Sequence, residues 1–202
     1  PEPAGKWLQA NGAQIRLSTR VSQITAAEHG ISIDGETFAA AIIATAPQHV
    51  GALWPAAATD FAYEPIATVY RNFVPKMKSP FPLSNRLGGH CQWVVDRGQG
   101  LLACVLSGHG TWEALDDAAL AATLDQELGL PNPTGWHKVI REKRATFSAT
   151  PGLHRPDFNT SNPRLFLAGD TTWADYPATL EGAVRSGRRA GQWARRGALI
   201  HE

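Results

Sequence analysis

The stretch that most constrains the fold of this chain runs from 165 to 194. A short apolar run, Leu165–Ala168, ends at the pair Gly169-Asp170, and a polar and aromatic loop follows it. The next segment then has one narrow face of small residues at helical spacing: Ala183, Gly187, Ala190 and Ala194. The pattern predicts a buried strand, a tight turn, and a helix that packs closely against another backbone.

The turn in this unit is suited to a ligand. A glycine at the carboxyl end of a buried strand lets a ligand approach the backbone, and Asp170 there offers acceptors for sugar or ribityl hydroxyls. Thr179 is expected to cap the following helix, whose first N–H groups carry a partial positive charge that suits an anionic ligand. The alternative is that Asp170 only caps a turn and the helix only packs. The arginines on the other faces of this helix, Arg189 among them, are expected to be solvated.

The amino-terminal part predicts a different organisation. Residues 1–10 are typical of a short helix. Apolar and polar residues alternate over 15–22, which predicts a half-buried strand, and turns at 29–30 and 34–35 extend it into an antiparallel meander over 15–40. Ala41–Ala46 is apolar without alternation, as in a strand of a helix-covered parallel sheet.

The central part is expected to be mostly antiparallel sheet with helices on one face. Thr111 is the expected cap of a helix that ends at Gly129. Strands are predicted over four stretches: Ile66–Phe73, Cys91–Val95, Leu101–Leu106 and Lys138–Phe147. Altogether the chain is expected to be a mixed α/β and α+β protein.

Charge and cysteine content exclude several classes of protein. Lys plus Arg is 19 and Asp plus Glu is 18, so a net charge of +1 gives no reason to expect a nucleic-acid binder. An apolar run of about 18 residues, as a membrane-spanning helix needs, is absent, and so is a visible export signal. Two cysteines cannot build a disulfide framework, so a reducing, cytoplasmic compartment is expected.

The sequence suggests two other hypotheses, a metal site and a hydrolase, with less support. A metal set could be drawn from His90, Cys91, Cys104 and His109. Its spacing matches no compact zinc pattern, so no metal is expected. A hydrolase built on Ser107, His109 and Asp170 lacks the nucleophile-elbow motif.

Several stretches resemble one family, the FAD-dependent amine oxidase and phytoene desaturase group. Its carboxyl-terminal flavin-binding segment resembles LFLAGDTTWADYPATLEGAVRSGRRAG, and the squalene-associated, hydroxysqualene dehydroxylase branch is closest to the part PATLEGAVRSG. The family's adenine-side helix and strand resemble WLQANGAQIRLSTRVSQI, and its strand leading back to the flavin domain resembles AAAIIATAP. The same branch also fits QWVVDRGQG and VIREKRATFSATP, so the resemblance spans nearly the whole chain.

The resemblance implies specific cofactor contacts. Gly169 and Asp170 would meet the pyrophosphate or ribityl part of FAD. The backbone N–H groups at the helix start would face the pyrimidine edge of the flavin ring, at Thr179, Leu180 and Glu181. Val21 would pair with adenine through its main chain.

The loop before the helix supplies the remaining candidates. Trp173 and Tyr176 are candidate substrate-binding residues. Asp175 and Tyr176 are weak candidates for a catalytic role, and no other side chain is an obvious acid for protonating a leaving hydroxyl.

One departure from the family matters more than any match. The family begins with a strand, a GxGxxG turn and a helix, and no GxGxxG occurs here. The sequence is therefore expected to be a carboxyl-terminal piece that binds FAD weakly or not at all by itself. Residues 1–50 and 160–202 would be incomplete FAD-binding regions, and 51–159 would be a substrate-binding domain. Expected partners are the missing amino-terminal half of the FAD domain and, through exposed apolar surface, a second copy.

The expected function belongs to the longer parent enzyme. By resemblance it is an FAD-dependent oxidoreductase that acts on a large apolar isoprenoid of the hydroxysqualene type by hydride transfer. The alternative within the family is an amine oxidase or a carotenoid desaturase. The alternative from another class is a non-catalytic module that binds a lipid or a protein. An insoluble substrate would also be consistent with peripheral attachment to a membrane.

Overall fold

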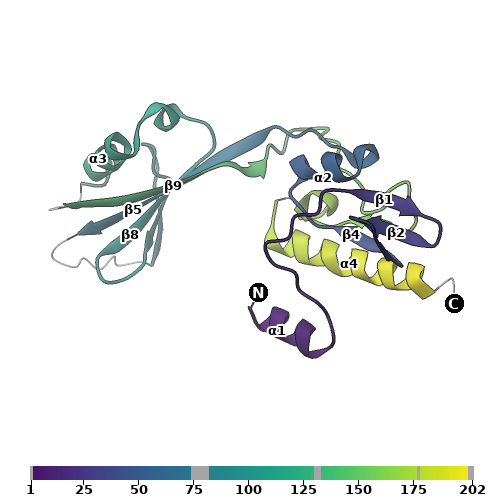
Figure 1. Cartoon of the computed structure of the whole chain (residues 1–202). Helices are drawn as coiled ribbons and strands as arrows, with labels where there is room; N and C mark the ends of the chain where they lie inside the picture. Colours follow the sequence, from purple (N-terminus) through teal and green to yellow (C-terminus); the bar gives the residue numbers. More distant parts are fainter. Residues whose placement is uncertain (1, 74–81, 130–132, 177, 200–202) are drawn as a thin grey trace. The chain divides into compact units, whose positions relative to one another are not determined.

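The computed structural model describes residues 2–73, 82–129, 133–176 and 178–199 (Figure 1). The fold is mixed α and β, as predicted. The chain divides into two compact units: unit 1 is Pro1–Asp60 with Leu153–Glu202, and unit 2 is Phe61–Gly152. Among the described helices, none is both long and apolar enough to cross a membrane.

Unit 1 is built around two short parallel strands that lie far apart in the sequence. Strand β4 (Ala41–Ile43) pairs with β10 (Leu165–Leu167), and Ala41 lies opposite Leu165. Both were predicted to be buried, because their apolar runs do not alternate. The prediction is correct for β10 and wrong for one position of β4, because Ile42 is 39% exposed. The strands are too short to form a core alone, so elements on both faces must cover them.

Helix α4 (Leu180–Leu199) covers one face of this parallel pair. Ala190 is fully buried there and packs with Phe166 of β10 and with Phe158. Small side chains at the contact let the helix axis come close to the sheet, which is the role predicted for this face. The opposite face packs against α2 (Pro47–Leu53), which is followed by a 3₁₀ turn, η1 (Pro55–Ala57), and against an antiparallel meander.

The meander consists of β1 (Ile24–Ala27), β2 (Gly30–Ile33) and β3 (Glu36–Phe38) in that order. The predicted turn at Asp34-Gly35 is present, and both residues have positive φ, as tight hairpins require. The Ser22 hydroxyl donates to the Asp34 carboxylate at 2.7 Å and lowers the pKa of that group.

The strand predicted over 15–22 is wrong. These residues join no ladder among the described residues, and Ser18 has a φ of 54°, which breaks an extended path. Ile15, Leu17 and Val21 are 40%, 81% and 37% exposed. A strand needs hydrogen bonds from a neighbouring strand, and no described strand lies beside this one to supply them. The helix predicted before it, α1 (Glu2–Ala10), is present.

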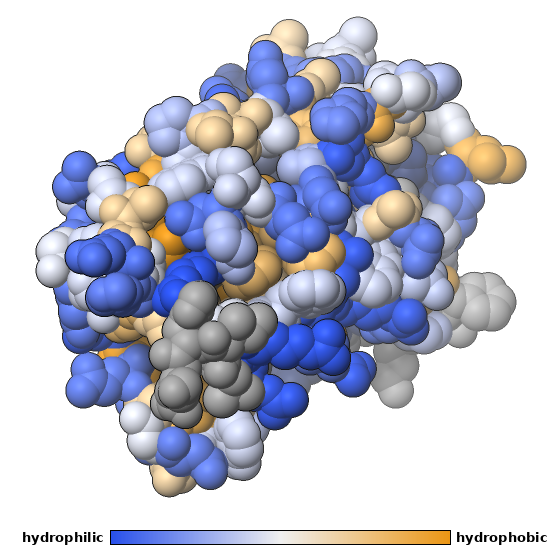
Figure 2. Space-filling model, turned by 90° about the vertical axis from the view of Figure 1, so that its right-hand side faces the viewer, coloured by the Kyte–Doolittle hydropathy of each residue, from blue (hydrophilic) through white to orange (hydrophobic). Residues whose placement is uncertain are grey.

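Apolar side chains therefore remain on the surface of unit 1. They include Trp7 of α1 and Ile42 of β4, besides the segment 15–21. Figure 2 shows one face of the molecule, on which apolar residues form several small patches among polar ones. Self-association through such surface stays a prediction.

Unit 2 is a five-stranded antiparallel sheet with one helix on one face. The strands, in spatial order, are β6 (Leu83–Asn85), β7 (Trp93–Asp96), β8 (Leu101–Ser107), β5 (Tyr63–Phe73) and β9 (Pro133–Phe147). Helix α3 (Asp117–Leu128) inserts Leu120 and Leu124 against Val69 and Cys104. The strands predicted for this region are thereby confirmed.

The predicted cap of α3 is misplaced. Thr111 begins a separate 3₁₀ turn, η2 (Thr111–Ala114), and Leu115 then returns to an extended conformation. The α-helix starts afresh after Asp116, whose carboxylate accepts the Ala119 N–H at 2.8 Å. A carboxylate at this position satisfies a free N–H of the first turn. The predicted end is correct, because Gly129 is left-handed with a φ of 58°.

Candidate functional site

The turn after β10 lies at the carboxyl edge of the parallel pair. The Ala168 N–H donates to the carbonyl of Ile43 at 2.9 Å, so the pairing continues to the last residue before the turn. Gly169 then takes a φ of 157° and a ψ of 170°, which a residue with a side chain rarely adopts. Ligands in open parallel sheets bind at this edge of the strands.

A narrow hollow opens at the same edge. Its walls come from the ends of both strands, at Ile43 and Ala168, from the start of α2 at Pro47, and from Thr171 and Thr172. Both threonines are buried in η3 (Asp170–Thr172). Among the described residues, none forms a hydrogen bond with the Asp170 carboxylate, so its oxygens are available as acceptors.

Polar side chains of α4 hold this turn. The backbone N–H of Gly169 donates to the Ser186 hydroxyl at 3.1 Å, and the hydroxyls of Ser186 and Thr172 lie 2.5 Å apart. One nitrogen of Arg189 donates to the Thr172 carbonyl at 2.7 Å.

The prediction that Arg189 is solvated is wrong. Its guanidinium lies 4.2 Å from the ring centre of Phe158 and 4.8 Å from that of Trp173. An arginine is held strongly between two aromatic faces because its planar cation stacks on them. The sequence could not show this contact, since Phe158 is 31 residues away from Arg189.

The start of α4 is capped as predicted. The Thr179 hydroxyl accepts the Gly182 N–H and donates to the Tyr176 carbonyl, both at 3.0 Å. Ala178 before it is left-handed, with a φ of 52°. A Cβ at Gly182 would lie 2.3 Å from the Tyr176 carbonyl oxygen, so only glycine fits this close approach.

The first turn of α4 faces outward. Leu180 is 88% exposed, and Glu181 is exposed too. Glu181 accepts a hydrogen bond from Arg185 at 2.6 Å, which raises the pKa of Arg185. The N–H groups that begin a helix have no partner within it, so they remain donors for a group placed before them.

The predicted residues of the loop before α4 differ in burial. Trp173 is partly buried against Arg189, and Arg155 donates to its carbonyl at 2.9 Å. Asp175 and Tyr176 are exposed, and the Arg185 guanidinium lies 5.0 Å from the Tyr176 ring centre.

The structure thus joins two of the three predicted groups. Gly169-Asp170 and the start of α4 belong to elements that pack together, because η3 lies against α4, and the bonds between them are made at Ser186 and Arg189. Val21 stands apart in the segment without a ladder, and no hydrogen bond among the described residues links it to either group. Sequence reasoning missed the three side chains that hold the turn: Arg155, Ser186 and Arg189.

The arrangement can hold an anionic ligand with several hydroxyls. Asp170 supplies acceptors, Gly169 removes the side chain that would block a close approach, and the start of α4 supplies donors and positive potential. These are the features that the pyrophosphate, ribityl chain and ring edge of a flavin nucleotide require, so the residues present fit that group.

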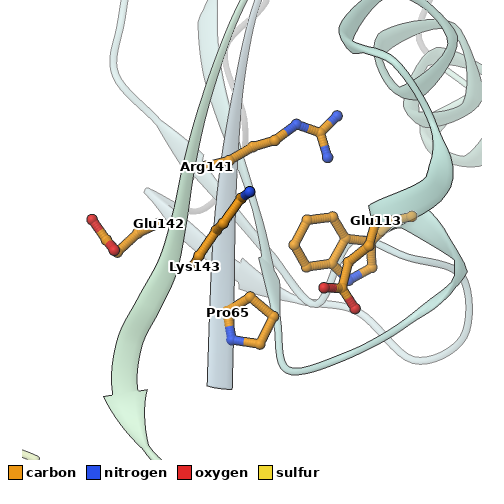
Figure 3. A pocket seen from close by; sticks show the side chains of 6 residues that line it. Pro65, Glu113, Arg141, Glu142 and Lys143 are labelled. Carbon is orange, nitrogen blue, oxygen red and sulfur yellow. The ribbon is translucent and has the colours of Figure 1, made fainter. Parts of the chain in front are cut away.

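Unit 2 has a separate hollow of mixed charge (Figure 3). Arg141 and Lys143 point to one side of β9, the side on which Glu113 lies, while Glu142 points to the other side. The Arg141 guanidinium lies 5.8 Å from the ring centre of Trp112. The Arg141 guanidinium is occupied by the Asp117 carboxylate and the Leu115 carbonyl. This hollow therefore offers no set of convergent free groups.

The described residues do not form the hydrolase triad or the metal site that the sequence analysis considered. His109 uses one ring nitrogen on Glu113, which raises the pKa of His109, and the other on the Tyr63 carbonyl, so no hydrolase triad forms. His90 lies between Glu127 and Thr111. In the described ranges, no group of three His, Cys, Asp or Glu gathers as metal ligands do.

The chain is similar to several known proteins. A family model described as flavin containing amine oxidoreductase matches residues 4–192. The hydroxysqualene dehydroxylase of Rhodopseudomonas palustris is 31% identical over 205 residues, which are 94% of this chain and 48% of that protein. The hydroxysqualene dehydroxylase of Sinorhizobium fredii is 28% identical, with the same two shares.

More distant relatives cover less of the chain or share only the fold. A probable zeta-carotene desaturase of Synechococcus elongatus is 33% identical but covers 46% of the chain. A solved structure of a putrescine oxidase variant superposes with a TM-score of 0.62 at 16% identity, over 96% of this chain and 52% of that one. The chain spans about half the length of the curated relatives it matches most fully.

Proposed function

Because the chain belongs to the family of flavin-containing amine oxidoreductases, we propose that it supplies the carboxyl-terminal half of an FAD site in an oxidoreductase. The observation that carries this proposal is the Gly169-Asp170 turn at the carboxyl edge of β10, packed against α4, where the Thr179 cap takes the Gly182 N–H and not those of Leu180 and Glu181. Together these present acceptors and donors for the two parts of one nucleotide.

Each part of the turn has a role in this proposal. Asp170 would accept hydrogen bonds from ribityl hydroxyls, or lie beside the pyrophosphate. The N–H groups at Leu180 and Glu181 would face the pyrimidine edge of the flavin ring, where negative charge builds up on reduction. A helix amino terminus stabilises such charge by about 0.3–1 kcal/mol when exposed, and by more when buried.

The bound flavin would transfer a hydride to the substrate or accept one from it. This chain's part is to orient the nucleotide and to keep its ring edge in a positive potential. Trp173 and Tyr176 stand in the loop before α4, where we assign them to substrate contact. Asp175 and Tyr176 stay weak candidates for proton transfer, and both are open to solvent.

The relatives that cover the chain most fully support a proposed substrate class. Two proteins that match 94% of it are hydroxysqualene dehydroxylases, whereas the desaturase match covers 46%. We therefore assign a large apolar isoprenoid of the hydroxysqualene type as substrate. Its reduction would take up one hydride and one proton and release the hydroxyl as water, giving squalene. Hydride removal from a carotenoid or an amine is the second candidate.

The unpartnered parts of unit 1 support a proposed partner. Segment 15–22 has the alternation of a strand but joins no ladder with the described residues, and Ile42 in the middle of β4 is exposed. A strand–GxGxxG–helix half would supply parallel strands for these edges and donors for the pyrophosphate. The chain alone is therefore expected to bind FAD weakly.

The test uses the protein purified with its natural flanking sequence. We expect a flavin absorption spectrum and, with chemically reduced flavin, conversion of hydroxysqualene to squalene detected by mass spectrometry. Asp170→Ala should weaken FAD binding about tenfold or more, since hydrogen bonds to a charged group contribute about 1.5–3 kcal/mol. Asp60→Ala, an exposed carboxylate of the same unit, is the matched control. A colourless protein, or equal affinity in both variants, would refute the proposal.

A further inference from the structure

We propose that Ser186 and Arg189 are positioning residues that fix the Gly169–Thr172 turn and the ring of Trp173 in the conformation the cofactor site needs. The identity of the cofactor rests on the function proposed above. The contacts that hold the turn do not depend on it.

The hydroxyl of Ser186 is fully engaged with the turn. It accepts the Gly169 N–H at 3.1 Å, and its neighbour at 2.5 Å is the Thr172 hydroxyl. Thr172 in turn lies 3.0 Å from the Gly169 carbonyl, to which it donates. Only one assignment of hydrogens satisfies all three contacts: Ser186 donates to Thr172, and Thr172 donates to Gly169. Both backbone polar groups of Gly169 are thus bonded through one chain of hydroxyls.

Ser186 differs from its neighbours on the small-residue face. Ala190 packs against the sheet with a methyl group alone, so packing by itself does not call for a hydroxyl on this face. Ser186 is 0% exposed, and burying a hydroxyl is unfavourable unless it is hydrogen-bonded. Every partner of its hydroxyl belongs to the turn, so the turn is what the hydroxyl stabilises.

Arg189 acts on the other end of the same turn. It donates to the Thr172 carbonyl at 2.7 Å and stacks its guanidinium between Phe158 and Trp173. Arg155 reinforces this end by donating to the carbonyls of Trp173 and Ala174 at 2.9 and 2.7 Å. The orientation of the Trp173 ring therefore depends on an arginine of α4.

The consequence is a fixed spacing within the site. Ser186 lies six residues after Leu180, which is about 9 Å along a helix that rises 1.5 Å per residue. Tying Gly169 to Ser186 therefore sets how far the turn lies from the amino end of α4. One rigid helix positions both groups that would contact the nucleotide.

The first test measures amide hydrogen exchange in the chain without any cofactor. Ser186→Ala should speed exchange of the Gly169 amide about tenfold or more, because its acceptor is lost. Ser186→Cys keeps a group at the hydroxyl position, slightly larger than the hydroxyl, but a thiol is a weak hydrogen-bonding group, so this variant should show the same change without leaving a cavity. Arg188→Ala is the control, since Arg188 is an exposed arginine beside Arg189. Unchanged protection of Gly169 in both Ser186 variants would overturn the proposal.

The second test separates positioning from general stability. In the full-length flavoprotein, Ser186→Cys and Arg189→Ala should each raise the dissociation constant for FAD about tenfold and shift the visible bands of the flavin. Arg189→Lys keeps the charge but not the stacking, and should restore affinity only in part. Lower melting temperatures with unchanged FAD affinity and spectrum would mean a merely structural role. If the wild-type protein binds no FAD, the proposed function fails, while the exchange result still decides whether the turn is held.

Discussion

Gly182 offers the sharpest perturbation of the helix start. A Cβ at this position would lie 2.3 Å from the carbonyl oxygen of Tyr176, whereas ordinary contact begins at 3.4 Å. Gly182→Ala therefore forces that carbonyl to retreat by about 1 Å, the shortfall from an ordinary contact. The same carbonyl accepts the hydroxyl of Thr179, so the cap of α4 loosens with it.

The expected loss of stability in Gly182→Ala follows from this crowding. Extra atoms in a packed site typically cost about 1–3 kcal/mol, and weakening a cap adds up to about 1 kcal/mol. Gly191→Ala, on the same helix, meets nothing within 4 Å. It should stabilise the helix by about 0.5–1 kcal/mol, as alanine usually does in place of an interior glycine. The same substitution at two positions of α4 is thus predicted to change the free energy of unfolding in opposite directions.

Urea unfolding followed by far-ultraviolet circular dichroism measures both changes. We expect a lower midpoint for Gly182→Ala and a higher one for Gly191→Ala, each relative to the wild-type chain. Equal midpoints for the two variants would refute the claim that the loop before α4 lies against the helix backbone at Gly182.

Two further predictions concern unit 2. Asp125→Asn should destabilise it by about 3–5 kcal/mol, because Arg71 is 3% exposed and would be left as a buried charge without its carboxylate partner. Asp117→Asn breaks an ion pair on the surface of the same helix and should lower the free energy of unfolding by about 1 kcal/mol or less in the same assay. In an NMR titration His109 should have a pKa above that of an ordinary histidine, because the Glu113 carboxylate stabilises its charged form, and Glu113→Gln should lower that pKa. The pair stabilises the folded chain below the unfolded pKa of histidine, and this stabilisation is lost as pH rises through the folded pKa. A His109 pKa that is the same in Glu113→Gln as in the wild type would contradict the contact.

The elements that carry the site could be predicted because their signals are local. Strand β10 and the turn at Gly169-Asp170 follow from an apolar run and its ending, and the Thr179 cap follows from a hydroxyl before a helical repeat. The face that packs on the sheet follows from the spacing of Ala190 and its small neighbours.

What sequence reasoning missed depends on long-range partners. The alternation over 15–22 indicates the side chains of a strand but cannot show whether a neighbouring strand is present. Arg189 looks like any solvated arginine until Phe158 and Trp173 are brought against it. Ser186 fits a pattern of small residues, so its hydroxyl carries no signal until the Gly169 turn lies beside it.

In the proposed site, FAD lies across the Gly169 turn and the start of α4. Amide exchange of the full-length protein, measured with and without FAD, tests it most directly. FAD should slow exchange at 169–172 and at 180–182, while exchange at the outer end of the helix near 195 stays unchanged. Tight FAD binding with no added protection at either segment would contradict it.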